Sequence, residues 1–230
     1  MTINSEYLYL QELIYTSKNY DKAREIILNS DKKNEVKYQE LLGLIYFYQF
    51  DFLKSAEIFK NISDKYKYAY SLLLLNKPDE CKEVLNTATL SPAVNWTLFF
   101  CEMFSPHVTH TPTYLQIRSF LERDLNLYLK NGLVEYVQKI IDISDFLFEV
   151  NPETNKLIAK TFLYNNYYEF ANEYLTRAFE YTDKDAELFY LSGIYYLEKN
   201  EISDAKNSFK KTLLLNDNYI PAKIRLEELD

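Results

Sequence analysis

Apolar residues recur at three- and four-residue spacing along almost the whole chain, and few Gly or Pro residues interrupt them. This pattern predicts helices throughout. In the clearest segment, Glu198 to Glu201 form a polar turn between two helices. One face of the first helix carries Leu188, Phe189, Ser192, Gly193 and Tyr196, and one face of the second carries Ile202, Ala205, Phe209 and Leu213. The small Gly193 and Ala205 predict a close contact between the paired helices, because a large side chain would hold their axes apart.

The stretch 152–219 contains the same unit twice. The paired positions, each 34 residues apart, are Ala159 with Gly193, Phe162 with Tyr196, Ala171 with Ala205, and Leu175 with Phe209. A period of 34 residues is typical of a two-helix repeat, whose units bury their apolar faces by stacking on neighbours.

This spacing of an aromatic residue, a small residue, a tyrosine and then Ala and Phe resembles the tetratricopeptide repeat (TPR) family. Four units carry it: Phe189, Ser192, Gly193, Tyr196, Ala205 and Phe209; Leu42, Gly43, Tyr46, Ser55 and Phe59; Ile158, Ala159, Phe162, Ala171 and Leu175; and Tyr7, Leu10, Gln11, Ile14, Ala23 and Ile27. Gln11, Gln39 and Asn155 depart from the pattern. The resemblance implies an all-α superhelix of helix hairpins.

Two further stretches are predicted to be degenerate repeats. The segment 64–88 is too short for two full-length helices, and 118–150 keeps the large apolar positions and a turn glycine, Gly132, without the small residues. Prolines and β-branched residues in 105–112 break the pattern after a helix that starts at Pro92. We therefore expect repeats in 1–104, an irregular joint in 105–112, and repeats in 113–230, with six to seven helix pairs in all.

The last segment, 219–230, is predicted to be a capping helix. Ile220, Ile224 and Leu229 lie on one side of it, and Lys223 with neighbouring carboxylates lies on the other. A stack of repeats needs such a polar outer face for solubility.

Composition narrows the function. With only three glycines among 230 residues, the chain has no glycine-rich loop for phosphates, and a net charge of -8 disfavours a nucleic-acid partner. No secretory signal is visible, and no apolar run reaches the ~20 residues that span a bilayer. Cys81 and Cys101 lie among apolar residues and are expected to be buried free thiols. A reducing, cytoplasmic location and no cofactor are the expectation.

Candidate chemistry is sparse. His107 and His110, the only histidines, share the 105–112 segment and could contribute to a metal site, but neither a cysteine nor a carboxylate lies in that loop. No set of nucleophile and base can be assembled from the other residues, so no enzymatic activity and no resident metal are expected. Carboxylates such as Asp185 and Glu187 are interpreted as solvated charges near a helix start.

The resemblance implies that non-core positions of each first helix line a concave groove that holds a protein or peptide. These positions are Leu8, Glu12, Tyr15, Glu40, Leu44, Phe47, Tyr48, Glu122, Asn126, Lys156, Lys160, Leu163, Tyr164, Glu187, Tyr190, Ile194 and Leu197. Lys156 and Lys160, one turn apart, could bind a carboxylate of the partner or could be solvated surface lysines. The tyrosines could likewise bind a partner or pack between helices. Glu122, Leu157 and Leu191 disfavour the family's C-terminal carboxylate clamp.

The function predicted from these patterns is a noncatalytic adaptor that binds a peptide or helix in its groove. One alternative is a structural subunit that assembles through its end and outer faces. A weaker alternative is a metal protein or enzyme built on His107 and His110. The oligomeric state stays open.

Overall fold

A computed structural model describes residues 5–104 and 107–229, all of whose regular elements are helical. The chain divides into two compact units, Met1–Thr111 and Pro112–Asp230. The helices of unit 1 are α1 (Ser5–Gln11), the π-helical turn η1 (Glu12–Thr16), α2 (Tyr20–Asn29), α3 (Val36–Tyr48), α4 (Phe52–Asn61), α5 (Lys65–Leu74), α6 (Pro78–Leu85) and α7 (Pro92–Glu102).

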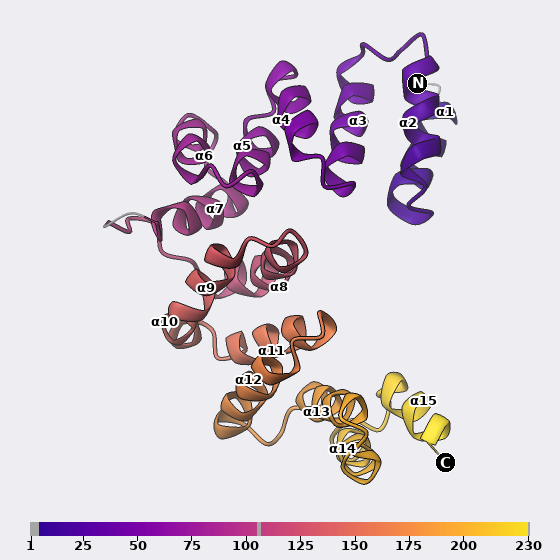
Figure 1. The fold of residues 1–230 in the computed structure, drawn as a ribbon, viewed down its shortest axis with the longest axis vertical. Helices are drawn as coiled ribbons and strands as arrows, with labels where there is room; N and C mark the ends of the chain where they lie inside the picture. Colours follow the sequence, from indigo (N-terminus) through magenta and orange to yellow (C-terminus); the bar gives the residue numbers. More distant parts are fainter. Residues whose placement is uncertain (1–4, 105–106, 230) are drawn as a thin grey trace. The chain divides into compact units, whose positions relative to one another are not determined.

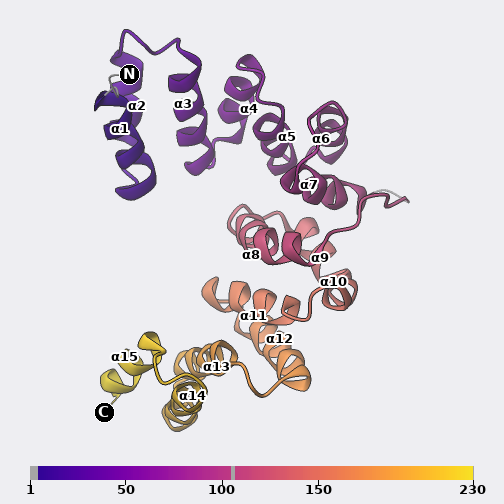
Figure 2. The same cartoon turned by 180° about the vertical axis from the view of Figure 1, so that it is seen from behind.

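Unit 2 continues the helical pattern. Its elements are α8 (Tyr114–Lys130), α9 (Val134–Asp142), α10 (Ser144–Val150), α11 (Thr154–Tyr164), α12 (Tyr168–Tyr181), α13 (Ala186–Glu198), α14 (Ile202–Leu215) and α15 (Ile220–Leu229). Within each unit, Figures 1 and 2 show successive helices packed side by side as antiparallel hairpins. Six hairpins are present in the described residues: α1 and η1 with α2, α3 with α4, α5 with α6, α8 with α9, α11 with α12, and α13 with α14. The predicted all-α, TPR-like stack of helix pairs is confirmed.

In two of the hairpins, α3 with α4 and α13 with α14, a glycine of the first helix meets a phenylalanine sixteen positions later. A methyl group built on Gly193 would lie 2.7 Å from Phe209 Cδ1, and one built on Gly43 would lie 2.9 Å from Phe59 Cε1. Both phenylalanine side chains are fully buried. These distances are shorter than any ordinary carbon contact, so the two helices can approach this closely only because glycine has no side chain.

The turns inside the hairpins repeat as well. Gly132, Asn166 and Asn200 follow one another at 34-residue intervals, and all three have positive φ angles of 60 to 65°. Glycine and asparagine are the residues that adopt this left-handed conformation most readily, and they commonly end helices in this way. The three residues therefore fix the same turn geometry in the three hairpins of unit 2.

Three parts of the structure differ from simple helix pairs. In the first hairpin, the π-helical turn η1 starts directly after Gln11, the large residue in the place that Gly43 and Gly193 occupy elsewhere. The segment 64–88 does form two helices, α5 and α6, but they are short. In the degenerate unit 118–150, the second helix breaks at Ile143 into α9 and α10. The broken end is held by the Tyr174 and Arg177 side chains, which donate to Ser144 Oγ over 3.1 and 3.3 Å.

The last helix corrects an expectation. Ala222, not the isoleucines, is the fully buried residue of α15, and Ile220 and Ile224 are 57 % and 49 % exposed. Ala222 lies 34 residues after Leu188, the buried residue at the start of α13, so α15 packs on α14 in the register of a first helix. The outer face of α15 is therefore partly apolar rather than the predicted polar cap.

Cys81 and Cys101 are both buried and form no disulfide, as expected from their apolar surroundings. Within residues 5–104 and 107–229, no helix has the length and apolar character that crossing a bilayer requires.

Asn155 generates a prediction about stability. Its side chain is 3 % exposed, and Oδ1 has no hydrogen-bond partner among the described residues. The same position one repeat earlier is Leu121, which is fully buried. Because an unsatisfied buried polar atom costs about 1–3 kcal/mol, Asn155→Leu is expected to raise the free energy of unfolding by about 1 kcal/mol in urea denaturation. If both Asn155→Leu and Asn155→Ala lower the unfolding midpoint, the amide has a partner in the folded protein.

Candidate functional site

The first helices of unit 2 present one continuous set of side chains, which we call the first-helix face. Its members are Glu122 and Asn126 on α8, Lys156, Lys160 and Tyr164 on α11, and Glu187 and Tyr190 on α13. The 34-residue period aligns Glu122 with Lys156 and Tyr190, and Asn126 with Lys160. Since α11 packs on both α8 and α13, these aligned positions lie on neighbouring helices.

Charged residues of this face are paired with one another across helices. Lys156 Nζ lies 2.6 Å from Asp185 Oδ2 and 3.3 Å from Glu187 Oε2. Lys160 Nζ lies 3.2 Å from Glu187 Oε1 and 3.4 Å from Glu122 Oε2. A chain of ion pairs therefore links α8, α11 and α13, and Glu187 binds both lysines.

The two lysines stay charged in this setting. Burial by itself would lower the pKa of Lys156, but the hydrogen bond that Lys156 donates to Asp185 and the negative charges of Asp185 and Glu187 outweigh it and raise the pKa. For Lys160, burial is likewise outweighed by the charges of Glu187 and Glu122, so its pKa also rises. Carboxylates of the neighbouring repeats already pair with both lysines, and binding of a partner's carboxylate to them stays an untested alternative. The lysines are not freely solvated, since their side chains are only 11 % and 26 % exposed.

Asp185 has two functions that the sequence pattern did not reveal. Its side chain accepts hydrogen bonds from the backbone N–H groups of Glu187 and Leu188 and so caps α13, and its other oxygen pairs with Lys156. Asp185 and Glu187 are therefore structural charges between repeats rather than solvated ends of a helix. The N-cap spacing before Leu188 could have indicated the first function, but the second depends on the stacking of α11 against α13.

Tyrosines remain the large accessible groups of the first-helix face. Tyr164 is 56 % exposed, whereas Tyr190 is half-buried and packs against Tyr219 with 5.1 Å between ring centroids. Burial, together with the negative charge of Glu187, raises the pKa of Tyr219 to about 12 and also raises the pKa of Tyr164. These hydroxyls are therefore neutral donors near pH 7. Tyr219 was not expected here, because it lies just before α15.

A polar hollow of about 380 Å³ lies between α8 and α11 beside Tyr164. It is lined by Arg118, Ser119, Glu122, Arg123, Asn126, Thr161, Tyr164 and Asn165. Asn165 Nδ2 donates to Asn126 Oδ1 over 3.0 Å and so fixes the orientation of that amide. The hollow therefore offers preoriented polar groups next to an exposed aromatic ring.

Two residues expected in the groove are not available to a partner. Ile194 is 8 % exposed and Leu163 is 2 % exposed. Both side chains are buried inside unit 2, like the other buried aliphatic residues of α11 and α13. The first-helix face is correspondingly more polar than the sequence predicted.

Unit 1 has a related but separate arrangement. Lys67 Nζ on α5 pairs with Glu40 Oε1 on α3 over 2.6 Å and with the N-cap Asp64 over 2.9 Å. Tyr15 is 51 % exposed, and burial together with the charges of Tyr48 and Glu40 raises its pKa. A lysine paired with a carboxylate of the neighbouring first helix, beside an exposed tyrosine, thus occurs in both units.

Two of the remaining groove positions of unit 1, Phe47 and Tyr48, stack on aromatic rings of other helices. Tyr48, 39 % exposed, stacks on Tyr20 with centroids 5.8 Å apart, and the half-buried Phe47 stacks on Tyr70 at the same separation. Packing between helices thus accounts for much of the aromatic surface of these residues, and Leu8, Tyr15 and Tyr48 keep exposed area.

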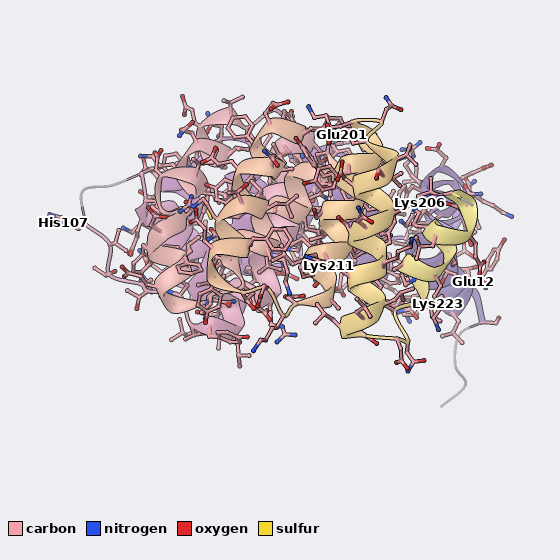
Figure 3. The ribbon with its side chains drawn as sticks, turned by 90° about the horizontal axis from the view of Figure 1, so that it is seen from below. Glu12, His107, Glu201, Lys206, Lys211 and Lys223 are labelled. Atoms are coloured by element: carbon pink, nitrogen blue, oxygen red, sulfur yellow. The ribbon has the colours of Figure 1, made fainter. Side chains whose placement is uncertain are left out.

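The two histidines do not converge. Figure 3 shows His107 standing out from the helices of unit 1, whereas His110 Nδ1 lies 2.8 Å from Glu102 Oε1. Ser105 and Pro106, at the start of the predicted joint 105–112, lie outside the described residues. Among the described residues, no group of three or more His, Cys, Asp or Glu side chains is arranged to hold a metal ion.

Glu102, which sequence reasoning missed, anchors the segment that follows α7. It is 1 % exposed and accepts hydrogen bonds from the Thr109 N–H and hydroxyl, each over 2.6 Å, and from the His110 N–H over 2.8 Å. Burial by itself would raise the pKa of the Glu102 carboxyl, but these hydrogen bonds outweigh it and lower the pKa from 4.5 to about 2. His110 therefore helps to hold a buried carboxylate.

Comparisons with known proteins give a limited result. No protein-family model matches the chain, and no curated protein matches it in sequence. The chain is similar to one in the crystal structure of the APC/C hetero-tetramer Cut9-Hcn1, with a TM-score of 0.38 and 16 % sequence identity over 99 % of this chain and 49 % of that one. It thus spans about half the length of that protein. The assignment to a TPR-like helix-hairpin fold rests on the repeat geometry described above.

Replacing Glu102 tests the anchor. A carboxyl with a lower pKa in the folded than in the unfolded state stabilises the fold above the unfolded value, and this contribution disappears as the pH falls from about 4.5 toward 2. Glu102→Gln is expected to lower the free energy of unfolding by about 2 kcal/mol at pH 7, because hydrogen bonds to a charged acceptor are lost. The difference from the unmodified protein should shrink below pH 4.5 in urea denaturation. A difference that is the same at pH 7 and pH 3 would show that the carboxylate charge is not what anchors the segment.

Proposed function

We propose that the chain is a noncatalytic protein-interaction scaffold and that the first-helix face of unit 2 binds a peptide or an amphipathic helix. This proposal rests on the exposed Tyr164 and on the polar hollow beside it, whose amide groups are held in place by hydrogen bonds. Ion pairs between the helices stabilise the same face. A tyrosine provides a large contact area and loses little rotamer freedom on binding. Because the ion pairs hold α8, α11 and α13 in place, the partner meets a surface that is already ordered.

The sequence suggested that Lys156 and Lys160 could bind a carboxylate of the partner, whereas we propose that they stabilise the face and do not contact the partner. Lys156 and Lys160 act by bracing the face, and a partner contacts Tyr164, Asn126 and the hollow beside them. Truncation of either lysine would leave a carboxylate unpaired and would weaken the stack itself. A loss of binding in such variants would therefore not identify a contact residue. The two buried thiols fit a reducing compartment such as the cytoplasm.

A second candidate function has its own observation. Leu214, Ile220 and Ile224 are 84 %, 57 % and 49 % exposed, so the end of unit 2 carries apolar surface that the expected polar cap would have covered. A structural subunit that assembles through its end face would use this surface. Under this alternative, substitution at α15 rather than at α11 would release the partner.

The test compares two tyrosines of similar exposure, 56 % for Tyr164 and 59 % for Tyr181. Tyr164→Ala changes the first-helix face, and Tyr181→Ala changes α12, where Tyr181 is 59 % exposed. Since a central aromatic contact contributes about 2 kcal/mol to binding, Tyr164→Ala is expected to weaken partner binding roughly 30-fold. The readout is affinity capture from the source cells followed by quantitative mass spectrometry.

Tyr181→Ala should leave the captured proteins unchanged, and circular dichroism should show that both variants are folded. Captures that are identical for the unmodified protein and Tyr164→Ala would contradict the proposed face. A partner that survives Tyr164→Ala but is lost with Ile220→Ser and Ile224→Ser would instead support the structural subunit.

A further inference from the structure

A second, apolar pocket lies away from the first-helix face, between the turn that follows α8, the helix α9 and the start of α12. Its volume is about 160 Å³, and its lining includes Leu133, Val134, Val137, Ile141, Tyr167 and Phe170. Val134 is 73 % exposed, and Tyr167 and Phe170 are each 44 % exposed. Aliphatic and aromatic side chains thus surround an opening to solvent.

The repeat architecture does not require this apolar surface. One period later, the positions of Tyr167 and Phe170 are occupied by Glu201 and Asp204, which are both exposed. Glu201, labelled in Figure 3, is the N-cap residue of the corresponding helix, α14. The hairpin of α13 and α14 packs with two carboxylates in these places. Tyr167 and Phe170 therefore supply exposed apolar area that packing of a hairpin does not demand.

The size of the pocket limits what can enter it. Cavities of about 150 Å³ lined by apolar side chains accept a molecule as large as benzene. One phenylalanine or leucine side chain is of that size. The pocket therefore fits one large apolar side chain of a partner rather than a whole helix face.

The two second helices that contribute to the pocket carry more negative than positive charge. Helix α9 and the first two turns of α12 carry four carboxylates, Glu135, Asp142, Glu169 and Glu173, against one lysine, Lys139. Glu169 pairs with Lys199 over 2.6 Å but is 83 % exposed, so it still contributes to the negative potential at the surface. Unit 2 as a whole has 14 basic and 20 acidic residues, a net charge of -6. Charge complementarity therefore favours a partner in which the apolar side chain that enters the pocket is flanked by positively charged residues.

We propose that this pocket is a docking site for a protein segment in which a single phenylalanine or leucine is flanked by lysine or arginine. The apolar side chain enters between α9 and α12, and the basic residues lie over Glu135 and Glu169. The first helices contribute Tyr128, Leu129 and Phe162 to the lining, but no residue of the first-helix face lines the pocket. Both sites can therefore be occupied in the same molecule.

The experiment uses the full chain and a defined probe. The probe is a capped, fluorescein-labelled pentapeptide with phenylalanine between two pairs of lysine, and its dissociation constant is measured by fluorescence anisotropy at low salt. Two control peptides replace the phenylalanine by alanine or the lysines by glutamate. Both controls are expected to bind at least ten-fold more weakly, and binding should weaken as salt is added.

The variants then locate the site. Val134→Ser alters an exposed side chain at the mouth of the pocket and should weaken the probe at least ten-fold without affecting the fold. Phe170→Ser should do the same, although Phe170 also stacks on Phe162 with 5.2 Å between centroids. Leu214→Ser, at an exposed leucine of α14, and Tyr164→Ala, on the first-helix face, should leave the dissociation constant unchanged.

Several results would overturn the proposal. It is wrong if Val134→Ser binds the probe as the unmodified protein does, or if the alanine or glutamate peptide binds equally well. Self-association of the protein that is abolished by Val134→Ser would show that a second copy occupies the pocket instead. Tyr164 does not line the pocket. The proposal for the pocket and the proposal for the first-helix face can therefore be contradicted independently of each other.

Discussion

The close approach of the paired helices at Gly43 and Gly193 is the constraint on which the rest of the structure depends. Gly193 sits against Phe209, and Gly43 against Phe59, at distances that leave no room for a methyl group. Ala159 and Leu175 occupy the equivalent positions of α11 and α12, and both are buried. This contact fixes the spacing of the helix axes, and the spacing determines which side chains of successive first helices can reach one another. The ion pairs of Lys156 and Lys160 with Asp185 and Glu187 follow from that arrangement, because they join neighbouring repeats.

The same geometry separates two kinds of surface. The first helices of unit 2 carry a polar face whose charges satisfy one another, so its binding capacity lies in Tyr164 and the hollow beside it. An apolar pocket opens beside α9 and α12, and the next repeat has Glu201 and Asp204 at the positions of its Tyr167 and Phe170. Repeats with one backbone plan can thus present different chemistry at equivalent positions, since only the small and large contact residues are required for packing.

The helix positions, the 34-residue period and the small contact residues could be read from the sequence, because each depends on local periodicity. The prediction was less successful wherever the outcome depended on a neighbouring repeat. Lys156 looked free, since nothing in α11 shows that Asp185 and Glu187 face it from α13. Ile194 looked accessible for the same reason, and Ile220 and Ile224 were placed on the wrong side of α15, where Ala222 makes the contact. Glu102 was missed because its partners, Thr109 and His110, come from an irregular segment without any periodic pattern.

A double-mutant cycle on Gly193 and Phe209 tests the central claim most directly. Gly193→Ala is expected to destabilise the protein by about 1–2 kcal/mol despite alanine's better helix propensity, because its methyl group overlaps the buried ring. In the background of Phe209→Leu, where the ring is gone, the same substitution should be neutral or stabilising, giving a coupling of at least about 1 kcal/mol in urea denaturation. Destabilisations that simply add would contradict the account, because the two residues would then not set the distance between the helices.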